Sequence, residues 1–248
     1  MDDYYQSQQR IYNQTWADGI KQGKEQRGNL DSNLKFLNRS GLIKSDKKIL
    51  EVGCGAGGVV NETKKRGCRV IGTDISNIAV EYGRKKFPGI ELKVGLAEKL
   101  EFMDSSFDLV LSFDVLEHLA EVDKHLEEVR RVLVDGGYYL LQTPNKYSNS
   151  VYETLKLGSI KWRRYHPSLH TAGQLKHRFN RHGFDVRFVK MPALNKYSLD
   201  KLKYNWLKRI AGAIDFGKLP LMTQTNFYVV ARKKATGARS EKQARGSS

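Results

Sequence analysis

The 248-residue sequence is poor in cysteine and has no long apolar run. Its two cysteines are separate: Cys54 lies in a glycine-rich run, and Cys68 opens a strand-like run. They predict neither a disulfide framework nor a metal cluster. No stretch approaches the length needed to cross a bilayer, and no opening apolar run flanked by basic residues resembles a signal peptide. We therefore expect a cytoplasmic protein without a membrane-spanning helix.

The chain does contain enough apolar sequence for one sizeable core, because 40% of its residues are hydrophobic. This proportion and length are typical of a single globular domain. Strand-like and helical stretches alternate as far as Gln142, which predicts a parallel sheet. Helices are also expected near residues 29–38 and 171–181, strands at residues 184–190 and 223–231, and an inserted helix near residues 199–214.

Residues 49–60, ILEVGCGAGGVV, predict a strand that turns through glycines into a helix. Glycines at these positions let the chain turn sharply and let a ligand lie against bare backbone. Gly53, Gly55 and Gly58 also satisfy G-x-G-x-x-G, so the glycines alone do not separate a dinucleotide from another nucleotide-like cofactor. Glu51 shifts the balance, because a carboxylate there repels a pyrophosphate and attracts an ammonium or sulfonium group. S-adenosylmethionine carries both cations.

Three further stretches extend the pattern. Asp74 ends a strand-like run about twenty residues after the glycines, the spacing at which a βαβ unit brings a carboxylate to a ribose diol. Residues 106–119, SFDLVLSFDVLEHL, predict a buried strand that breaks at Phe113. Residues 129–145, VRRVLVDGGYYLLQTPN, predict the end of a helix, a Gly-Gly turn and another apolar strand.

With these motifs the chain resembles the class I S-adenosylmethionine-dependent methyltransferases. The likeness is to the small-molecule type 11 and ubiquinone-biosynthesis-like group, with E-V-G-C-G-x-G, V-L-E-H and P-G-G-x-L motifs. The last motif is matched in part, since Asp135 stands where the proline would be. The resemblance is close over residues 47–145. It implies a Rossmann-like α/β fold: a seven-stranded, mostly parallel sheet with a reversed last strand and helices on both faces.

The resemblance also suggests how the chain is divided. Residues 1–46 would form an N-terminal lid and the first helices. Residues 47–232 would form a single methyltransferase domain, with a helical insertion at residues 191–222. Residues 233–248 would be a disordered basic tail. The leading aromatic residues support the lid, because relatives fold an N-terminal helix over the cofactor; they are Tyr4, Tyr5, Tyr12 and Trp16.

The cofactor implied by the resemblance is S-adenosyl-L-methionine, which leaves as S-adenosyl-L-homocysteine. The implied cofactor-binding residues are Glu51, Gly53, Cys54, Gly55, Gly57, Asp74, Ile75, Ala97, Glu98 and Phe113. The glycine loop would line the methionine part, with Glu51 beneath it helping to hold the ammonium group. Asp74 would bind both ribose hydroxyls, and Ile75 would pack on the adenine face.

One position departs from the family's pattern. Relatives usually have an acidic residue that meets the adenine amino group, but the segment here reads GLAEKLEF, with Leu96 in that place. The backbone of Ala97 could serve the ring instead. Glu98 is the nearest carboxylate, and we expect it to be a solvated loop residue.

The charge of the chain is distributed unevenly. The formal net charge is +16, and counting Lys and Arg against Asp and Glu gives about −3 for residues 48–145 and about +12 for residues 146–212. In the family the second part builds the substrate pocket, so a polyanion, a phosphorylated small molecule or an anionic membrane surface would be attracted. Residues 199–214 predict a basic amphipathic helix, which either covers the pocket or lies on such a membrane.

Nucleic acid is a less favoured partner. Residues 161–164, KWRR, interleave an aromatic residue with basic ones, as single-strand binders do. However, the turn at residues 112–115 reads SFDV, without the Asn/Asp-Pro-Pro-aromatic motif of enzymes that methylate exocyclic base amines. Neither cysteine lies where cytosine C5 chemistry needs a nucleophile.

Methyl transfer asks little of side chains, because positioning and exclusion of water can suffice. An oxygen acceptor benefits from a base, and the candidates are His118 in LEHL and His166 and His170 in RYHPSLHT. No metal is expected. The predicted function is O-methylation of a small acceptor, which includes anionic and lipid-like molecules. The alternatives are an RNA or nucleotide-linked acceptor and a cofactor-binding module without catalysis. The oligomeric state stays open.

Overall fold

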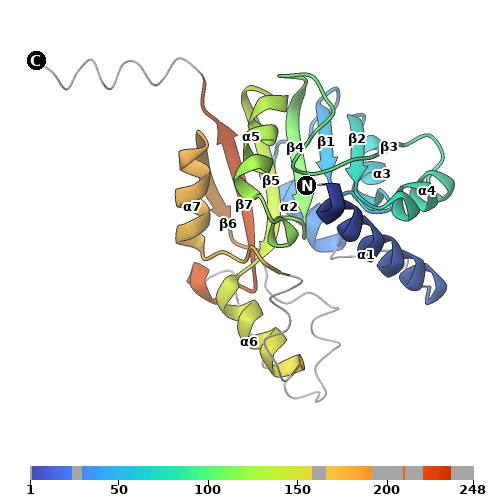
Figure 1. The fold of residues 1–248 in the computed structure, drawn as a ribbon. Helices are drawn as coiled ribbons and strands as arrows, with labels where there is room; N and C mark the ends of the chain where they lie inside the picture. The colour runs from blue at the N-terminus through green and yellow to red at the C-terminus, as the bar shows by residue number, and fades with distance from the viewer. Residues whose placement is uncertain (1, 24–29, 158–165, 192–208, 210–219, 236–248) are drawn as a thin grey trace, which may run out of the picture.

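Seven strands form one sheet in the computed structural model, which describes residues 2–23, 30–157, 166–191, 209 and 220–235 (Figure 1). The strands are β1 (Lys48–Val52), β2 (Arg69–Asp74), β3 (Glu91–Val94), β4 (Phe107–Phe113), β5 (Leu133–Pro144), β6 (Phe184–Val189) and β7 (Asn226–Lys233). The helices are α1 (Asp2–Lys21), α2 (Leu30–Ser40), α3 (Gly58–Lys64), α4 (Asn77–Lys86), α5 (Val122–Val132), α6 (Lys146–Leu157) and α7 (Ala172–Arg181).

The order of the strands is β3-β2-β1-β4-β5-β7-β6. Strands β1 to β5 pair in parallel, whereas β7 runs antiparallel to both of its neighbours, β5 and β6. The predicted mostly parallel sheet with a reversed last strand is confirmed. Successive strands are added on one side of β1 up to β3 and on its other side from β4 onward, so the strand order reverses between β1 and β4. In open α/β sheets, ligands bind outside the carboxyl ends of the strands at such a point.

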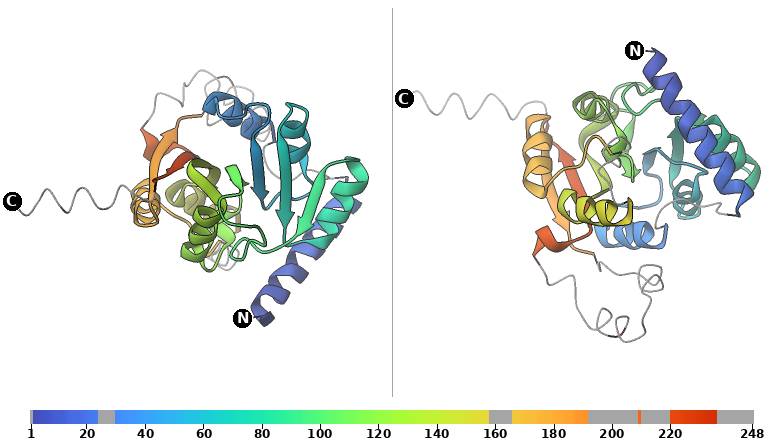
Figure 2. Two further views of the ribbon diagram at one scale, coloured as in Figure 1. Left: turned by 90° about the horizontal axis from the view of Figure 1, so that it is seen from above. Right: turned by 60° about the horizontal axis from the view of Figure 1, so that its bottom comes forward.

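The two faces of the sheet carry separate parts of the core. Along β4, Val110 packs into a cluster with apolar residues of α5 and α7, while Leu109 and Leu111 pack into a second cluster with residues of α2 and α3. Alternation of this kind follows from the two-residue period of a strand. Because both faces are covered, β4 is apolar along almost its whole length. Figure 2 shows the helices on the two sides of the sheet.

Two predicted boundaries were wrong by a few residues. The Gly-Gly pair does not precede the strand but lies inside β5, where the pairing with β4 shifts register and Gly136 has φ 74°. The last strand begins at Asn226, because Leu221–Thr223 form a short 3-10 helix. The helix expected at residues 171–181 is confirmed, with Thr171 as its N-cap in a reciprocal capping box with Gln174.

Several predictions fall outside the described residues. These are most of the inserted helix at residues 199–214, of which the structure describes only residue 209, and most of the tail at residues 233–248. The domain boundaries stay predictions. In the part of the chain that the structure describes, no helix is long and apolar enough to span a membrane.

Candidate functional site

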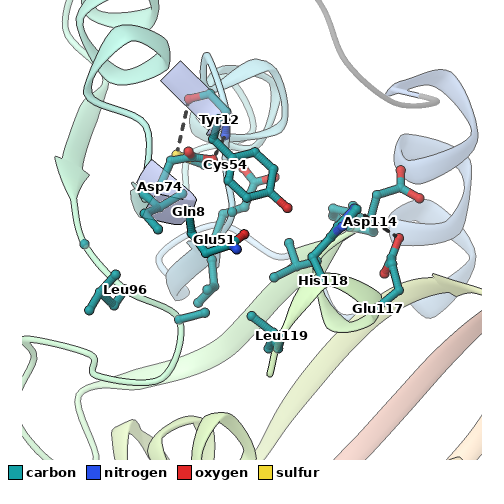
Figure 3. A pocket seen from close by; sticks show the side chains of 18 of the residues that line it. Gln8, Tyr12, Glu51, Cys54, Asp74, Leu96, Asp114, Glu117, His118 and Leu119 are labelled. Carbon is teal, nitrogen blue, oxygen red and sulfur yellow. Dashed lines mark hydrogen bonds and ion pairs between the residues drawn. The ribbon is translucent and has the colours of Figure 1, made fainter. Parts of the chain in front are cut away.

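A cavity of about 520 Å³ lies at the carboxyl ends of β1, β2 and β4, where the strand order reverses. Its size is within the range of small-molecule sites. Helix α1 and the glycine loop after β1 form part of the wall, and the segments after β3 and β4 form the rest. In Figure 3, Asp74 and Leu96 lie to one side of Glu51, and His118 and Glu117 lie to the other. The cavity therefore has two ends with different chemistry.

The glycine loop has a conformation that other residues rarely adopt. Gly53, Gly55 and Gly57 have φ values of 70°, 53° and 78°, in the left-handed region that favours glycine. A Cβ atom on Gly53 would also collide with Val115, and one on Gly55 would come within 2.6 Å of Trp16 Cζ2. The glycines thus serve the sharp turn that the sequence predicted, and Gly53 and Gly55 also allow Val115 and Trp16 to pack closely on the loop.

Asp74 ties this loop to the next helix. Its Oδ2 accepts a hydrogen bond of 2.8 Å from the Gly55 amide, and its Oδ1 accepts one of 2.8 Å from the Ser76 amide. Ser76 in turn caps α4. The carboxylate also lines the cavity, at the position where the sequence predicts a ribose contact.

Glu51 is the most unusual group of the cavity. Its side chain is only 3% exposed, and among the described residues its Oε2 has no hydrogen-bond partner. Burial first, and then the nearby Asp74 carboxylate, raise the pKa of Glu51 to about 8. A buried carboxyl group in this state is stabilised by a cation or a hydrogen-bond donor. A ligand with an ammonium group fits this position.

The remaining predicted cofactor residues also lie at the cavity, except Gly57, which is not part of its lining. Its lining includes Cys54, Ile75, Ala97, Glu98 and Phe113. The expectation that Glu98 is solvated was wrong, because it is only 5% exposed. The first turns of α1 cover this region: Tyr4 and Tyr5 line the cavity, and burial, followed by the Glu98 carboxylate, raises the pKa of both phenols.

Helix α1 crosses the cavity and is fastened on both sides. On one side, Gln9 Nε2 donates a hydrogen bond of 2.9 Å to the Ile75 carbonyl. On the other, the Tyr5 hydroxyl donates one of 3.1 Å to Glu121, beside the start of α5. All the leading aromatic residues singled out in the sequence line the cavity: Tyr4, Tyr5, Tyr12 and Trp16. The helix is therefore placed where a lid over a cofactor would lie.

Two histidines meet at the other end of the cavity. The rings of His118 and His166 lie 4.9 Å apart between centroids, and the Tyr12 ring meets His118 edge-on at 5.9 Å. Beneath them, Glu117 is buried: its Oε1 lies 3.9 Å from His118 Nε2, and its Oε2 accepts a 3.1 Å hydrogen bond from Thr143. The structure thus brings together two of the three predicted base candidates.

The sequence analysis missed Asp114 and Glu117, which line the cavity beside these histidines. Burial raises the pKa of Asp114, and burial and the Asp114 charge raise that of Glu117. Asp114 has φ 54°, which few non-glycine residues adopt. The available signal was two acids three residues apart in the turn after β4. Including Glu51, Asp74 and Glu98, the described lining has five carboxylates and neither lysine nor arginine.

His170 is not at the cavity, which excludes it as a residue of this site within the described structure. It is 7% exposed, and its Nδ1 has no hydrogen-bond partner among the described residues. Burial, followed by the Arg178 charge, lowers its pKa to about 4. Its carbonyl accepts a 3.1 Å hydrogen bond from the Lys146 amide, and it directly precedes the N-cap of α7. His170 therefore lies at the entry to α7, away from the cavity.

A seven-stranded Rossmann-like sheet with a reversed last strand and a glycine-lined cavity at its reversal point is the architecture of the class I methyltransferases. Comparison with known proteins agrees: residues 50–141 match the family model described as a methyltransferase domain. Over residues 50–141 the chain is thus similar to the methyltransferase domain. Within the described residues, no group of three histidine, cysteine or acidic side chains is arranged to hold a metal ion.

Similar proteins are methyltransferases as well. A probable S-adenosylmethionine-dependent methyltransferase of Mycolicibacterium smegmatis is 35% identical over 104 residues, which are 42% of this chain and 40% of the relative. A ubiquinone biosynthesis O-methyltransferase of Chelativorans sp. is 30% identical over 103 residues, 40% of this chain and 41% of the relative. The chain thus spans about two fifths of the length of these curated relatives.

A solved structure shares the fold. It is a putative methyltransferase in complex with the Haloferax volcanii Trm112 methyltransferase activator, with a TM-score of 0.67 and 20% identity over 89% of this chain and 97% of that chain.

Proposed function

We propose that this chain is an enzyme that transfers the methyl group of S-adenosylmethionine to a small-molecule acceptor, with oxygen as the expected acceptor atom. The observation that carries the proposal is the buried Glu51 carboxyl group, whose Oε2 has no partner among the described residues and which lies beside the glycine loop. A dinucleotide would bring a pyrophosphate to this loop, where the Asp74 carboxylate would repel it and Glu51 would find no cation. A cofactor with an ammonium group and a ribose offers Glu51 a cation and Asp74 hydroxyl donors.

The chain's residues bind this cofactor at one end of the cavity. Glu51 holds the ammonium group, Asp74 accepts from the ribose hydroxyls, and Ile75 packs against the base. Helix α1 excludes water through Tyr12 and Trp16, which line the same cavity. When bound, the cofactor supplies a methyl group on a sulfonium, a good leaving group. Positioning in a water-poor site then provides much of the rate.

The histidine pair supports transfer to oxygen. As the new carbon–oxygen bond forms and the carbon–sulfur bond breaks, a hydroxyl acceptor loses its proton, and His118 or His166 can take it. Glu117 lies 3.9 Å from His118 Nε2, where its carboxyl group, when ionised, stabilises the charged ring. Because the described lining has no lysine or arginine, it suits an uncharged hydroxyl better than an anionic group at the reacting end. An anionic part of the acceptor would extend toward the basic second half of the chain.

Calorimetric titration with S-adenosylmethionine, S-adenosylhomocysteine and NADH tests the cofactor. We expect the first two to bind and NADH not to bind. Asp74→Ala should abolish binding, whereas Asp108→Ala, a control that removes a carboxylate from the other end of the sheet, should not. Binding of NADH in place of the other two would overturn the proposal.

A second candidate is an RNA or nucleotide-linked acceptor, favoured by the charge of about +12 over residues 146–212. The third is a cofactor-binding module without catalysis. Release of S-adenosylhomocysteine with phenolic acceptors, with RNA or with neither distinguishes the three. Turnover with any acceptor excludes the non-catalytic module.

A further inference from the structure

We propose that His125 is a positioning residue that holds the backbone of Ala97 in the cavity wall and so makes the cofactor site selective for adenine. The inference rests on the proposed function, since it requires the base to lie against residues 95–98. His125 itself does not line the cavity. It acts from behind the wall, inside the core.

His125 lies in α5, is fully buried and uses both ring nitrogens. Its Nδ1 lies 2.8 Å from the Ala97 carbonyl oxygen, and its Nε2 lies 2.9 Å from the Tyr139 hydroxyl. That hydroxyl lies 2.6 Å from Ser112 Oγ in β4, and both residues are fully buried. A chain of three hydrogen bonds therefore connects the segment after β3 with β4, whose next residue, Phe113, also lines the cavity.

The direction of this chain is fixed. A carbonyl only accepts, so the proton of the neutral imidazole is on Nδ1 and Nε2 must accept from Tyr139. The Tyr139 oxygen then accepts from Ser112. Burial lowers the pKa of His125 to about 4, which keeps the ring neutral near pH 7. One tautomer thus satisfies every polar atom of this hydrogen-bond chain, and such a fully satisfied buried network is rigid.

The same helix fastens the segment at a second point. The Leu100 amide donates a 2.7 Å hydrogen bond to Glu128 Oε2, and Arg131 Nη2 donates one of 2.7 Å to the Leu100 carbonyl. With His125 at Ala97, the wall is held at both ends by α5. Residues 97–100 are thus fixed by hydrogen bonds rather than by apolar packing alone.

This rigidity matters for the base because of Leu96. Its apolar side chain lines the cavity and offers no acceptor to an amino group. A hydrogen bond to the edge of the base then comes from the backbone of residues 96–98 or from the Glu98 carboxylate, and the position of both depends on this segment. Backbone groups recognise an edge only when they are held in place, and His125 fixes the central residue of this segment.

Two substitutions separate positioning from stability. Asn places its amide nitrogen as many bonds from Cα as Nδ1 of His, so His125→Asn keeps the bond to Ala97 and loses the one to Tyr139. Gln places its amide oxygen as many bonds from Cα as Nε2 of His, so in His125→Gln this oxygen accepts from Tyr139 and the Ala97 bond is lost. Both variants remove one buried hydrogen bond and are expected to lower the melting temperature similarly.

The readout is the preference for S-adenosylhomocysteine over S-inosylhomocysteine, in which donor and acceptor on the base edge are reversed. The ratio of their dissociation constants is measured by calorimetry for the wild-type protein and both variants. We expect the wild-type protein and His125→Asn to prefer the adenine ligand by at least about tenfold, the value of one hydrogen bond of ordinary strength. In His125→Gln this preference should fall about tenfold, with little change for the inosine ligand.

Other outcomes overturn the inference. Equal losses for both ligands in His125→Gln, or equal preferences in the two variants, would show a merely structural residue. A wild-type protein that binds both ligands equally would refute adenine selection and leave the proposed function intact, whereas one that binds neither would refute the proposed function itself. If His125→Asn does not fold, Tyr139→Phe replaces it and must keep the preference, because it also retains only the Ala97 bond. If His125→Gln does not fold, His125→Leu replaces it and must lower the preference; the opposite result in either would overturn the inference.

Discussion

Trp16 packs directly on Gly55: a Cβ added to Gly55 would lie 2.6 Å from Trp16 Cζ2. The indole is 5% exposed and forms a small core cluster with Ala56 and Ala79. The contact joins α1 to the loop that would hold the cofactor, so the helix stabilises the fold and closes the cavity through one side chain.

Trp16→Ala should lower both stability and cofactor affinity. Removing a buried tryptophan costs roughly 3–5 kcal/mol of unfolding free energy in a well-packed core, and the glycine loop loses its covering wall. Thermal melting and calorimetry with S-adenosylhomocysteine measure the two effects. Ile11→Ala on the same helix, at a residue 47% exposed, is the control and should change neither. A Trp16→Ala protein with wild-type affinity would refute the role of this contact in binding.

Deletion of residues 1–24 tests α1 as a whole. Without the helix, the cavity loses Tyr4, Tyr5, Tyr12 and Trp16 and opens to water, so the cofactor should bind more weakly, by about tenfold or more. The remaining domain should retain its far-ultraviolet circular dichroism apart from the lost helix. Unchanged affinity in a folded deletion variant would remove the lid hypothesis.

Cofactor affinity should rise with pH below about pH 8, because Glu51 has a pKa raised to about 8. Below that value the carboxyl group is protonated in the free protein, and binding an ammonium group favours its charged form, so a proton is released. The affinity then changes by up to about tenfold per pH unit. Between about pH 6 and pH 7 the ligand's own amino group stays charged.

Glu51→Gln is the matched variant. It cannot release the proton, and its affinity should be lower than that of the wild-type protein and flat over the same range. Calorimetry in two buffers of different ionisation enthalpy counts the protons directly. Equal proton release in both proteins would show that another group is responsible.

The same shift affects the folded state without ligand. Between the unfolded pKa of 4.5 and the folded value of about 8, the native protein binds a proton that the unfolded chain does not. Stability from this group therefore falls as pH rises through that window. The melting temperature of the wild type, measured relative to that of Glu51→Gln, should accordingly fall from about pH 5 to pH 8.

His118→Asn and His166→Asn separate the two base candidates. Replacing the residue that takes the acceptor's proton should lower kcat by about 10² or more, with little effect on cofactor affinity. The other should have a smaller effect on kcat. His177→Asn, at an exposed position of α7, is the control. If both variants turn over at the wild-type rate, transfer needs positioning alone.

Much of the fold could be predicted from the sequence because its signals are local. The glycines of the loop must adopt positive φ, the apolar run of β4 must be buried on both faces, and Thr171 with Gln174 must cap a helix. The Gly-Gly pair was misplaced because the register of β5 is set by its pairing with β4, which is not a local property.

The candidate site was predicted in part. Glu51 and Asp74 were found because their distance along the chain from the glycines is fixed by a βαβ unit. The burial of Glu98 was not predicted, since it depends on tertiary packing that the local sequence does not encode. His170 shares a short stretch with His166, yet the two side chains lie in different surroundings.

The sequence by itself determined the order of strands and helices, the left-handed glycine loop and the carboxylates at the strand ends, because backbone sterics and side-chain periodicity act over a few residues. Only the tertiary structure decided which of those groups lose their water. Among the described residues, the Glu51 Oε2 atom is buried without a partner. The pairing of His118 with His166 and the hydrogen bonds from Ser112 through Tyr139 and His125 to Ala97 join residues far apart in the chain. Desolvation and hydrogen-bond geometry depend on what packs around a group, and that is a property of the folded chain.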